Sequence, residues 1–357
     1  MRKMQETIVK GKRIFIGLED AKRTWKLCVR SEGMVVHETS MPGEYEVLRN
    51  YLHKKYPGCA ITVMYEAGFH GFWLHDLLMA DGIKCIVTPP NKVTQAKDDS
   101  VKTDRRDARR LAKNLETGDC VSCHVPDRKR REDRQVSRLL NQLQKEIVRT
   151  KNRIRRMLEY HGLDRGLKAG VWCDRDYHEL SRKKWLEDLS SSLRKVLEVL
   201  LAVLDFLCAQ KKEILQELKH ISEEERYRRS VASKKSCPGV GWLSATRFTL
   251  EWGGLERFPT GKRFASYTGL TASEYSTGET IRRGRITGQS NPYVRSWLIE
   301  CAWRAIKRDP VLLEKFTSVY RSSGSKKKAI VAVARKLAVR MRALDVNNDS
   351  YLIGVVE

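Results

Sequence analysis

The sequence has no long hydrophobic run. None of its 357 residues lies in an unbroken apolar stretch approaching the roughly eighteen that a membrane-spanning helix needs. The segment Met1 to Lys12 is polar and charged, without the apolar region or the small-residue cleavage site of a signal peptide. We therefore expect a protein that has no membrane partner and stays in the cytoplasm.

A paired cysteine framework is also missing. The nine cysteines are an odd number and are scattered along the chain. Cys120 and Cys123, followed by His124, have the spacing of a haem attachment site or of half a zinc site, but no second ligand pair stands at zinc spacing. Unpaired structural thiols in a reducing compartment are the better interpretation.

Acidic residues are scarce relative to basic ones. The chain has 69 Lys and Arg against 44 Asp and Glu, a formal net charge of +25. Such an excess repels itself unless the partner is a polyanion, and nucleic acid is favoured. Residues 128–156 hold twelve Lys or Arg against three acids, and residues 282–342 hold sixteen against three. The residues that we predict to contact phosphate there are Arg130, Arg131, Arg153, Arg155, Arg156, Arg282, Arg283, Arg285, Lys326, Lys327 and Lys328.

The first third of the chain alternates strand and helix patterns. Short β-prone segments over 13–18, 24–31 and 34–39 predict three antiparallel strands. A helix near 45–52, a strand over 60–65, a helix over 69–80, a strand over 84–88 and a helix over 104–118 follow. This order is typical of the ribonuclease H type of α/β fold.

The middle of the chain has a coiled-coil pattern. Apolar residues recur at alternating spacings of three and four over 140–157 and again over 193–221. The glycine-containing segment 162–180 between them suits the tip of an antiparallel helical arm. We expect an α/β domain over 1–127, the coiled-coil arm over 128–230, a mostly helical domain over 231–345 and a tail over 346–357.

Four acids have positions that suggest a metal site. Glu19 follows the first strand, Glu66 ends the fourth, and Asp104 and Asp107 lie three residues apart on one helix. The first and fourth strands are neighbours in a ribonuclease H type sheet, so these carboxylates can converge. Two Mg²⁺ ions about 4 Å apart could then support phosphoryl transfer. The simpler interpretation is that each acid is solvated or, for Asp104, caps its helix.

Two further segments are candidates. The turn Cys237-Pro-Gly239-Val-Gly241 is similar to a helix-hairpin-helix element, whose backbone N–H groups bind phosphate, although an ordinary helix connection fits equally well. Ser276, Thr277 and Gly278 precede Arg282, Arg283 and Arg285, a composition that suits a hydroxyl nucleophile beside a phosphate. Such a Ser-Thr-Gly sequence is more often a simple turn.

These motifs occur in an order that resembles the DEDD transposases of bacterial insertion sequences, which include Piv-type invertases and bridge-RNA-guided recombinases. The resemblance spans about residues 14–340 and rests on the segments Ile16 to Lys22, Tyr65 to Ala67, Lys102 to Ala108, Pro238 to Gly241 and Gly269 to Gly284. It implies a RuvC-like domain, a coiled-coil arm and a C-terminal transposase domain.

The resemblance also implies residue roles and partners. Glu19, Glu66, Asp104 and Asp107 would bind Mg²⁺, and a serine of the C-terminal domain would attack the scissile phosphate to give a phosphoserine. The partners would be target and donor DNA and an element-encoded bridge RNA. The protein would act near the bacterial nucleoid as a dimer or tetramer, with a site composed from different protomers.

The chain departs from the family pattern at two positions. Glu19 replaces the first aspartate of the family, with Asp20 beside it as a possible substitute ligand. Thr277 stands where the family serine precedes the glycine, and Ser276 lies one residue earlier. Because a threonine hydroxyl is more hindered, we favour Ser276 as the nucleophile and keep Thr277 as the alternative.

Three functions remain open at this point. The favoured one is a recombinase that acts through serine transesterification. A RuvC-like nuclease could use the same acids to activate water and would form no protein–DNA bond. A catalytically silent nucleic-acid-binding protein is the third, although it would gain nothing from acids that face phosphate.

Overall fold

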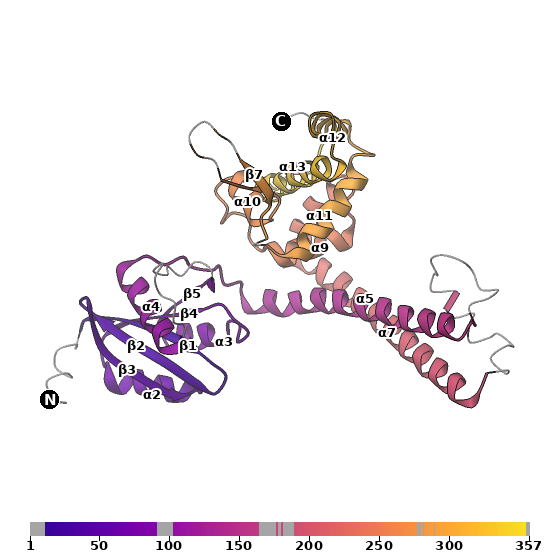
Figure 1. The fold of residues 1–357 in the computed structure, drawn as a ribbon. Coiled ribbons are helices and arrows are strands. Elements are labelled where there is room, and N and C mark those ends of the chain that lie inside the picture. Colours follow the sequence, from indigo (N-terminus) through magenta and orange to yellow (C-terminus); the bar gives the residue numbers. More distant parts are fainter. Residues whose placement is uncertain are drawn as a thin grey trace. The chain divides into compact units, whose positions relative to one another are not determined.

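The computed structural model describes residues 11–90, 103–163, 176–177, 180, 189–275, 277, 280, 282–288 and 290–354. It divides into two compact units, residues 1–126 and residues 127–357, which we describe separately. The first is a mixed α/β unit and the second is helical apart from one short hairpin (Figure 1). An α/β plus α fold class, as expected, is confirmed.

The first unit is built on a five-stranded sheet with the order β3-β2-β1-β4-β5. β1 pairs antiparallel with β2 and parallel with β4, so the chain makes a meander before it crosses over. The strands are β1 (Arg13–Asp20), β2 (Thr24–Ser31), β3 (Met34–Pro42), β4 (Ala60–Glu66) and β5 (Lys84–Thr88). The helices are α2 (Tyr45–Lys55), α3 (Trp73–Ala80) and α4 (Asp104–Thr117).

Alternation along the strands separates the two faces of this sheet. Ile14, Ile16 and Leu18 are fully buried in a core that also contains the inward residues of α2 and α3. The residues between them face the other side of the sheet, where Met64 packs with Leu111 of α4. The sheet therefore lies between α2 and α3 on one face and α4 on the other.

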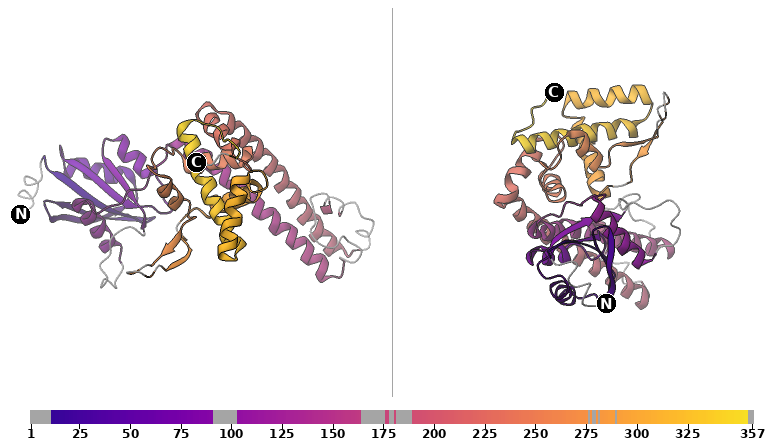
Figure 2. Two further views of the ribbon diagram at one scale, coloured as in Figure 1. Left: turned by 90° about the horizontal axis from the view of Figure 1, so that it is seen from above. Right: turned by 90° about the vertical axis from the view of Figure 1, so that its left-hand side faces the viewer.

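Two long helices begin the second unit. α5 (Arg128–Tyr160) and α7 (Ser191–Glu223) lie side by side (Figures 1 and 2), and Figure 1 shows that they run in opposite directions. Ile147 and Ile154 of α5 share a buried cluster with Leu197 and Leu204 of α7. The spacing of three and four therefore marks the face on which these helices pack together.

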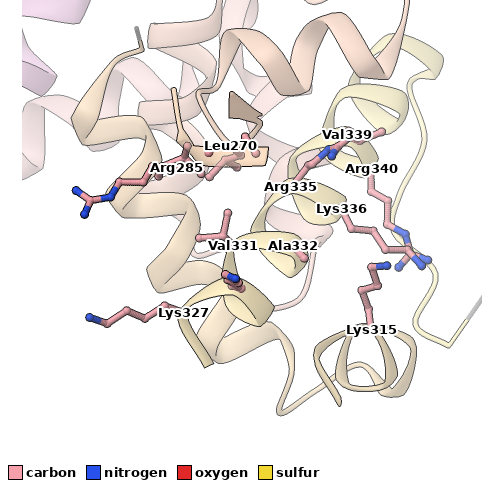
Figure 3. Close-up of a pocket in the computed structure, with 14 residues that line it drawn as sticks. Leu270, Arg285, Lys315, Lys327, Val331, Ala332, Arg335, Lys336, Val339 and Arg340 are labelled. Atoms are coloured by element: carbon pink, nitrogen blue, oxygen red, sulfur yellow. The ribbon is translucent and has the colours of Figure 1, made fainter. Parts of the chain in front are cut away.

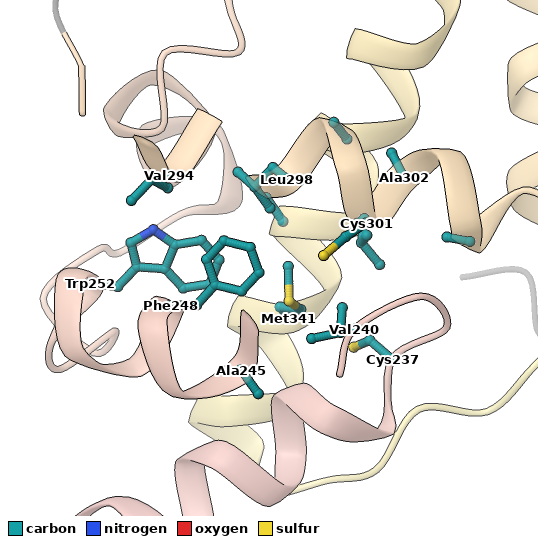
Figure 4. Close-up of a cluster of buried hydrophobic side chains, with 14 of the residues drawn as sticks. Cys237, Val240, Ala245, Phe248, Trp252, Val294, Leu298, Cys301, Ala302 and Met341 are labelled. Carbon is teal, nitrogen blue, oxygen red and sulfur yellow. The ribbon is translucent and has the colours of Figure 1, made fainter. Parts of the chain in front are cut away.

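The remaining helices surround a second core (Figure 4). Phe248 and Trp252 of α9 stack at 4.6 Å between ring centroids and lie in one buried cluster with Leu298 and Met341. The helices are α8 (Glu225–Ser236), α9 (Trp242–Trp252), α10 (Gly261–Tyr267), α11 (Pro292–Ala305), α12 (Pro310–Ser323) and α13 (Lys326–Asn347). The hairpin consists of β6 (Ala272–Glu274) and β7 (Arg283–Ile286).

The chain following α13 is held by polar contacts. The hydroxyl of Tyr351 donates to Asp309, whose carboxylate also lies 3.6 Å from the buried guanidinium of Arg340. The backbone N–H of Tyr351 donates to the Ser236 hydroxyl at 2.8 Å. These contacts attach residues near 351 to α8, α12 and α13, so this part of the tail is an integral piece of the unit.

Several local expectations need adjustment. The first strand extends to Asp20, so Glu19 lies inside it, and the helix expected from residue 69 begins at Trp73. α8 runs from 225 to 236, so residue 230, where the arm was expected to end, lies inside a helix.

The eight described cysteines are all unpaired, as expected. Of the described helices, none combines the length and the apolar character required to cross a bilayer.

Candidate functional site

The carboxyl ends of β1 and β4 bring two acids together. The parallel register pairs Gly17 with Met64 and Leu18 with Tyr65, so Glu19 and Glu66 are the next residues on neighbouring strands. Side chains at matching positions of parallel strands point to the same face. Both glutamates are half-buried and lie on the face that α4 covers.

A glycine in β1 allows α4 to approach this edge. A Cβ atom at Gly17 would lie 2.1 Å from the carbonyl oxygen of Ala108 and 2.4 Å from the backbone nitrogen of Ala112. Only a residue without a side chain permits such contact between strand and helix backbones. The approach places the first turn of α4, with Asp104 exposed and Asp107 buried, beside Glu19 and Glu66.

Arg110 lies between two of the acids. Its Nη2 atom donates to Asp107 Oδ1 at 2.5 Å and lies 3.7 Å from Glu66 Oε1. Among the described residues, Arg110 therefore supplies positive charge to this negative edge. The pKa of Glu19 is nevertheless raised to about 7, first by burial and then by the negative charges of Glu66, Asp107, Asp20 and Asp104. The negative charge at this edge is therefore only partly neutralised.

Asp20 has a different environment from Glu19. Its Oδ2 atom lies 3.1 Å from Nδ1 of His70, in the loop that precedes α3. Consecutive strand residues point to opposite faces, so Asp20 and His70 lie across the sheet from α4. Burial raises the pKa of Asp20, while His70 opposes the shift.

The helix cap at α4 is Thr103, whose hydroxyl accepts from the backbone N–H of Arg106 at 3.4 Å. The simpler interpretation of Asp104 as the cap is therefore wrong. Asp104 is the first residue of the helix, one turn before Asp107. Negative charge in a first helical turn is favoured by the helix dipole, so both aspartates are locally stable there.

The chemistry of these donors fits Mg²⁺, which prefers carboxylate oxygens. Among the described residues, no three His, Cys, Asp or Glu side chains converge closely enough to hold an ion as they stand. Arg110 occupies the space between Asp107 and Glu66 for which a cation would compete. The acids thus form a cluster by charge and position, with Arg110 as its present counterion.

The glycine turn between α8 and α9 is tightly packed. Gly239 is buried with φ +79°, and a Cβ atom there would lie 2.4 Å from the carbonyl oxygen of Cys301 on α11. Gly241 is exposed and stands at the start of α9. Gly239 therefore serves packing in this structure, and only Gly241 is accessible.

The hydroxyl candidates lie between β6 and β7. Thr277 is exposed, and its backbone pairs with that of Thr280 through hydrogen bonds of 3.2 and 3.1 Å. Tyr275 donates its N–H to the carbonyl of Arg282 at 2.9 Å, which closes the hairpin. Ser276 and the side chain of Arg283 lie outside the described residues.

The residues that were predicted to contact phosphate differ in their exposure to solvent. Arg130 donates to the carbonyl of Thr249 at 3.1 Å and lies over the ring of Tyr227, so it stabilises the unit itself. Arg131 and Arg155 are half-buried. The exposed residues are Arg153, Arg156, Arg282, Arg285, Lys326, Lys327 and Lys328.

A cavity of about 1390 Å³ lies beside the hairpin (Figure 3). Arg285 of β7, Lys315 of α12 and Lys327 of α13 line it, and the first and last of these were expected to contact phosphate. Arg335 and Lys336 of α13 line it as well and were missed. They follow Lys327 and Lys328 by eight residues, a helical spacing that could have revealed them.

The sequence comparisons point to one family. Residues 16–162 match the profile of IS110-type DEDD transposases, and residues 234–317 match that of the transposase IS116/IS110/IS902 family. The y4qE protein of Sinorhizobium fredii is 29% identical over 78% of this chain and 74% of its own length. The transposase for insertion sequence element IS1533 of Leptospira borgpetersenii is 23% identical over 92% of this chain and 95% of its own.

Proposed function

The chain belongs to the IS110 family of DEDD transposases, enzymes that cut and rejoin DNA, and we propose that it does so by serine transesterification directed by a guide RNA. The observation that carries the phosphoryl transfer is the gathering of Glu19, Glu66, Asp104 and Asp107 at one edge of the β1–β4 pair, whereas the serine and the guide RNA follow from the family resemblance. Acids gathered there in a protein of charge +25 would repel DNA unless a cation neutralised them.

The proposed architecture has three parts. The first unit is a RuvC-like domain of ribonuclease H type, which its sheet order and the antiparallel β2 support. α5 and α7 form the coiled-coil arm, and residues from 231 onward form the transposase domain. Guide RNA, target DNA and donor DNA then bind a dimer or tetramer, in keeping with the basic composition of the arm and of residues 282–342.

We assign Glu19, Glu66, Asp104 and Asp107 as the residues that hold Mg²⁺. A bound Mg²⁺ would supply positive charge to the phosphate oxygens. Asp107 is buried and Glu66 half-buried, so their positions are fixed by the fold, while exposed Asp104 is free to adjust. Arg110 would exchange its contact with Asp107 for one with DNA phosphate.

Ser276 is assigned as the nucleophile, with Thr277 as the alternative. The hydroxyl oxygen forms an ester bond to the scissile phosphorus, and its proton passes to solvent. The bond between that phosphorus and the leaving DNA oxygen breaks, and this oxygen takes a proton from solvent to become a hydroxyl group. Because no water is consumed, the protein–DNA ester retains the bond energy needed for rejoining. Arg282, Arg283 and Arg285 follow closely in the sequence and can hold the phosphate.

The experiment combines purified protein, Mg²⁺, DNA bearing the junction of the element and RNA from its flanking region. A denaturing gel then reports DNA that remains linked to protein. We expect an adduct with the unmodified chain and with Thr277→Ala, and none with Ser276→Ala. The reverse pattern would transfer the role to Thr277.

Two other outcomes would contradict the proposal. Cleaved DNA without an adduct would favour a RuvC-like nuclease that uses water. Binding of DNA without cleavage, with the guide RNA verified as bound, would exclude both reactions for that substrate.

A further inference from the structure

We propose that the cavity between the β6–β7 hairpin and α12–α13 is a groove for an unpaired, single-stranded polynucleotide. The inference rests on the proposed action on nucleic acid and adds the form of the strand and the residues that hold it. The groove is formed within the second unit and has a volume of about 1390 Å³, larger than the roughly 300–1,000 Å³ of small-molecule sites.

The lining of the groove carries only one sign of charge. Three elements supply its cations, and among the described residues no Asp or Glu lines it. In Figure 3, Arg285 and Lys327 extend at one side of the groove, while Lys315 and Lys336 lie at the other. A ligand between these two sides is contacted by cations along both edges, which suits a chain of phosphates.

Most of these cations have no internal partner. Within the described part of the chain, the side chains of Arg285, Lys315, Lys327, Lys328, Arg335 and Lys336 form no ion pair or hydrogen bond. By contrast, Arg340 at the base is buried and contacts Asp309 and Tyr351. Arg340 is thus neutralised within the protein, whereas the other six cations are available to an anionic ligand.

The position of the lysines in α13 strengthens this argument. Lys326, Lys327 and Lys328 occupy the first turn of that helix, after the N-cap Ser325. Cations in a first turn oppose the helix dipole and lower the stability of the helix. Local helix stability therefore does not explain their placement, whereas contact with a polyanion does.

The floor of the groove favours an unpaired strand over a duplex. Leu270, Val331 and Ala332 lie between the two charged sides. A duplex keeps its bases paired inside and presents phosphate and sugar, which gain little from an apolar floor. An unpaired strand can place its bases on that floor while its phosphates meet the cations.

The lining also predicts little discrimination between strands. The lining residues that the structure describes include no hydroxyl, amide, carboxylate or aromatic side chain. These side chains offer no acceptor for the proton of a 2′-hydroxyl and no ring on which a particular base could stack. Single-stranded DNA and single-stranded RNA of one sequence should therefore bind alike, with charge as the main contribution.

The test measures binding of short fluorescein-labelled oligonucleotides to the full chain by anisotropy, as single-stranded DNA, as single-stranded RNA and as duplex DNA. The groove variant is Lys328→Gln with Arg335→Gln. Its matched control is Lys307→Gln with Arg308→Gln, which removes two exposed charges of the same unit outside the groove lining. Thermal unfolding verifies that both variants fold.

We expect the groove variant to lose about tenfold in affinity for both single strands and to flatten the slope of log K against log salt by about 1.4. The control and the duplex should change much less. An equal loss in the control, an unchanged groove variant, or a loss confined to the duplex would overturn the inference.

The same proteins are also assayed for the DNA adduct. If the unmodified chain forms the adduct but the groove variant binds single strands normally, the groove assignment fails and the proposed function stands. The groove variant could instead bind single strands more weakly while the unmodified chain forms no adduct with junction DNA and guide RNA. That result would contradict the proposed function and support the groove assignment.

Discussion

Each unit has a cluster of side chains with charge of one sign, but only the cluster of the first unit has a counterion among the described residues. At the acidic edge of the first unit, Arg110 contacts Asp107 and approaches Glu66, so the structure supplies a counterion. In the groove of the second unit, the described residues provide no anion for Lys327 or Arg335. The acidic edge must exchange a partner to bind a cation, whereas the groove can accept phosphate directly.

Other cations of the second unit show that charge there can be compensated when stability requires it. Glu251 is buried and accepts hydrogen bonds from Arg138 at 2.9 and 3.1 Å, with Arg134 at 3.5 Å. Lys234 is fully buried and lies 3.0 Å from Asp345. The basic residues of this unit therefore form a stabilising set and a set available to a ligand.

The largest expected effect concerns the acidic edge. Asp107→Asn keeps the size of the side chain but removes its charge. If Asp107 holds the metal as proposed, losing that charge raises the activation barrier by several kcal/mol. DNA cleavage should fall by roughly 1,000-fold, measured as the initial rate of strand cutting. Glu46→Gln, at an exposed position of α2, is the control and should retain full activity. Equal rates in both variants would remove Asp107 from the site.

The next effect tests how the edge is assembled. Gly17→Ala places a Cβ atom against backbone atoms of α4 at 2.1 and 2.4 Å, and backbone atoms cannot rotate away. The free energy of unfolding should fall by about 3 kcal/mol, measured by urea denaturation. Gly68→Ala is the matched control, because its nearest atom would be 3.9 Å away. An unchanged stability in Gly17→Ala would show that α4 does not rest on β1.

A third prediction separates the two sets of cations. Glu251→Gln leaves Arg138 and Arg134 without their anion and should lower the free energy of unfolding by about 2–3 kcal/mol. Lys328→Gln should leave it unchanged or raise it slightly, since this lysine has no anionic partner among the described residues. A similar loss of unfolding free energy in both variants would contradict the separation of the basic residues into a stabilising set and a set available to a ligand.

The smallest effect is a pH dependence of the contact between Glu38 of β3 and the arginines of α4. Hydrogen bonds from Arg109, with those from Arg105, hold the pKa of Glu38 at about 2, below its usual value of 4.5. Its stabilising effect is complete above about pH 4.5 and is lost as the pH falls toward 2. Unfolding curves should show Glu38→Gln slightly less stable than the unmodified chain at pH 7, with the difference shrinking on acidification. A constant difference would refute this.

Local sequence patterns predicted the sheet and the helical pair because those patterns arise from the elements themselves. The apolar alternation in β1 and its order relative to β4 placed Glu19 next to Glu66. The contact of Arg110 with two acids depends on how closely α4 approaches β1. Gly17 permits this approach, but a glycine within an apolar strand does not by itself predict which helix will pack against it. The groove joins Arg285, Lys315 and Arg335 from three separate elements, and no local pattern connects them.

The most direct measurement identifies the residue that carries the DNA. The adduct formed with Mg²⁺, junction DNA and guide RNA is digested with nuclease and protease, and mass spectrometry locates the nucleotide remnant. We predict a phosphodiester on Ser276, in the peptide that also contains Thr277. Cleaved DNA together with an unmodified peptide would contradict transesterification and show that water is the nucleophile.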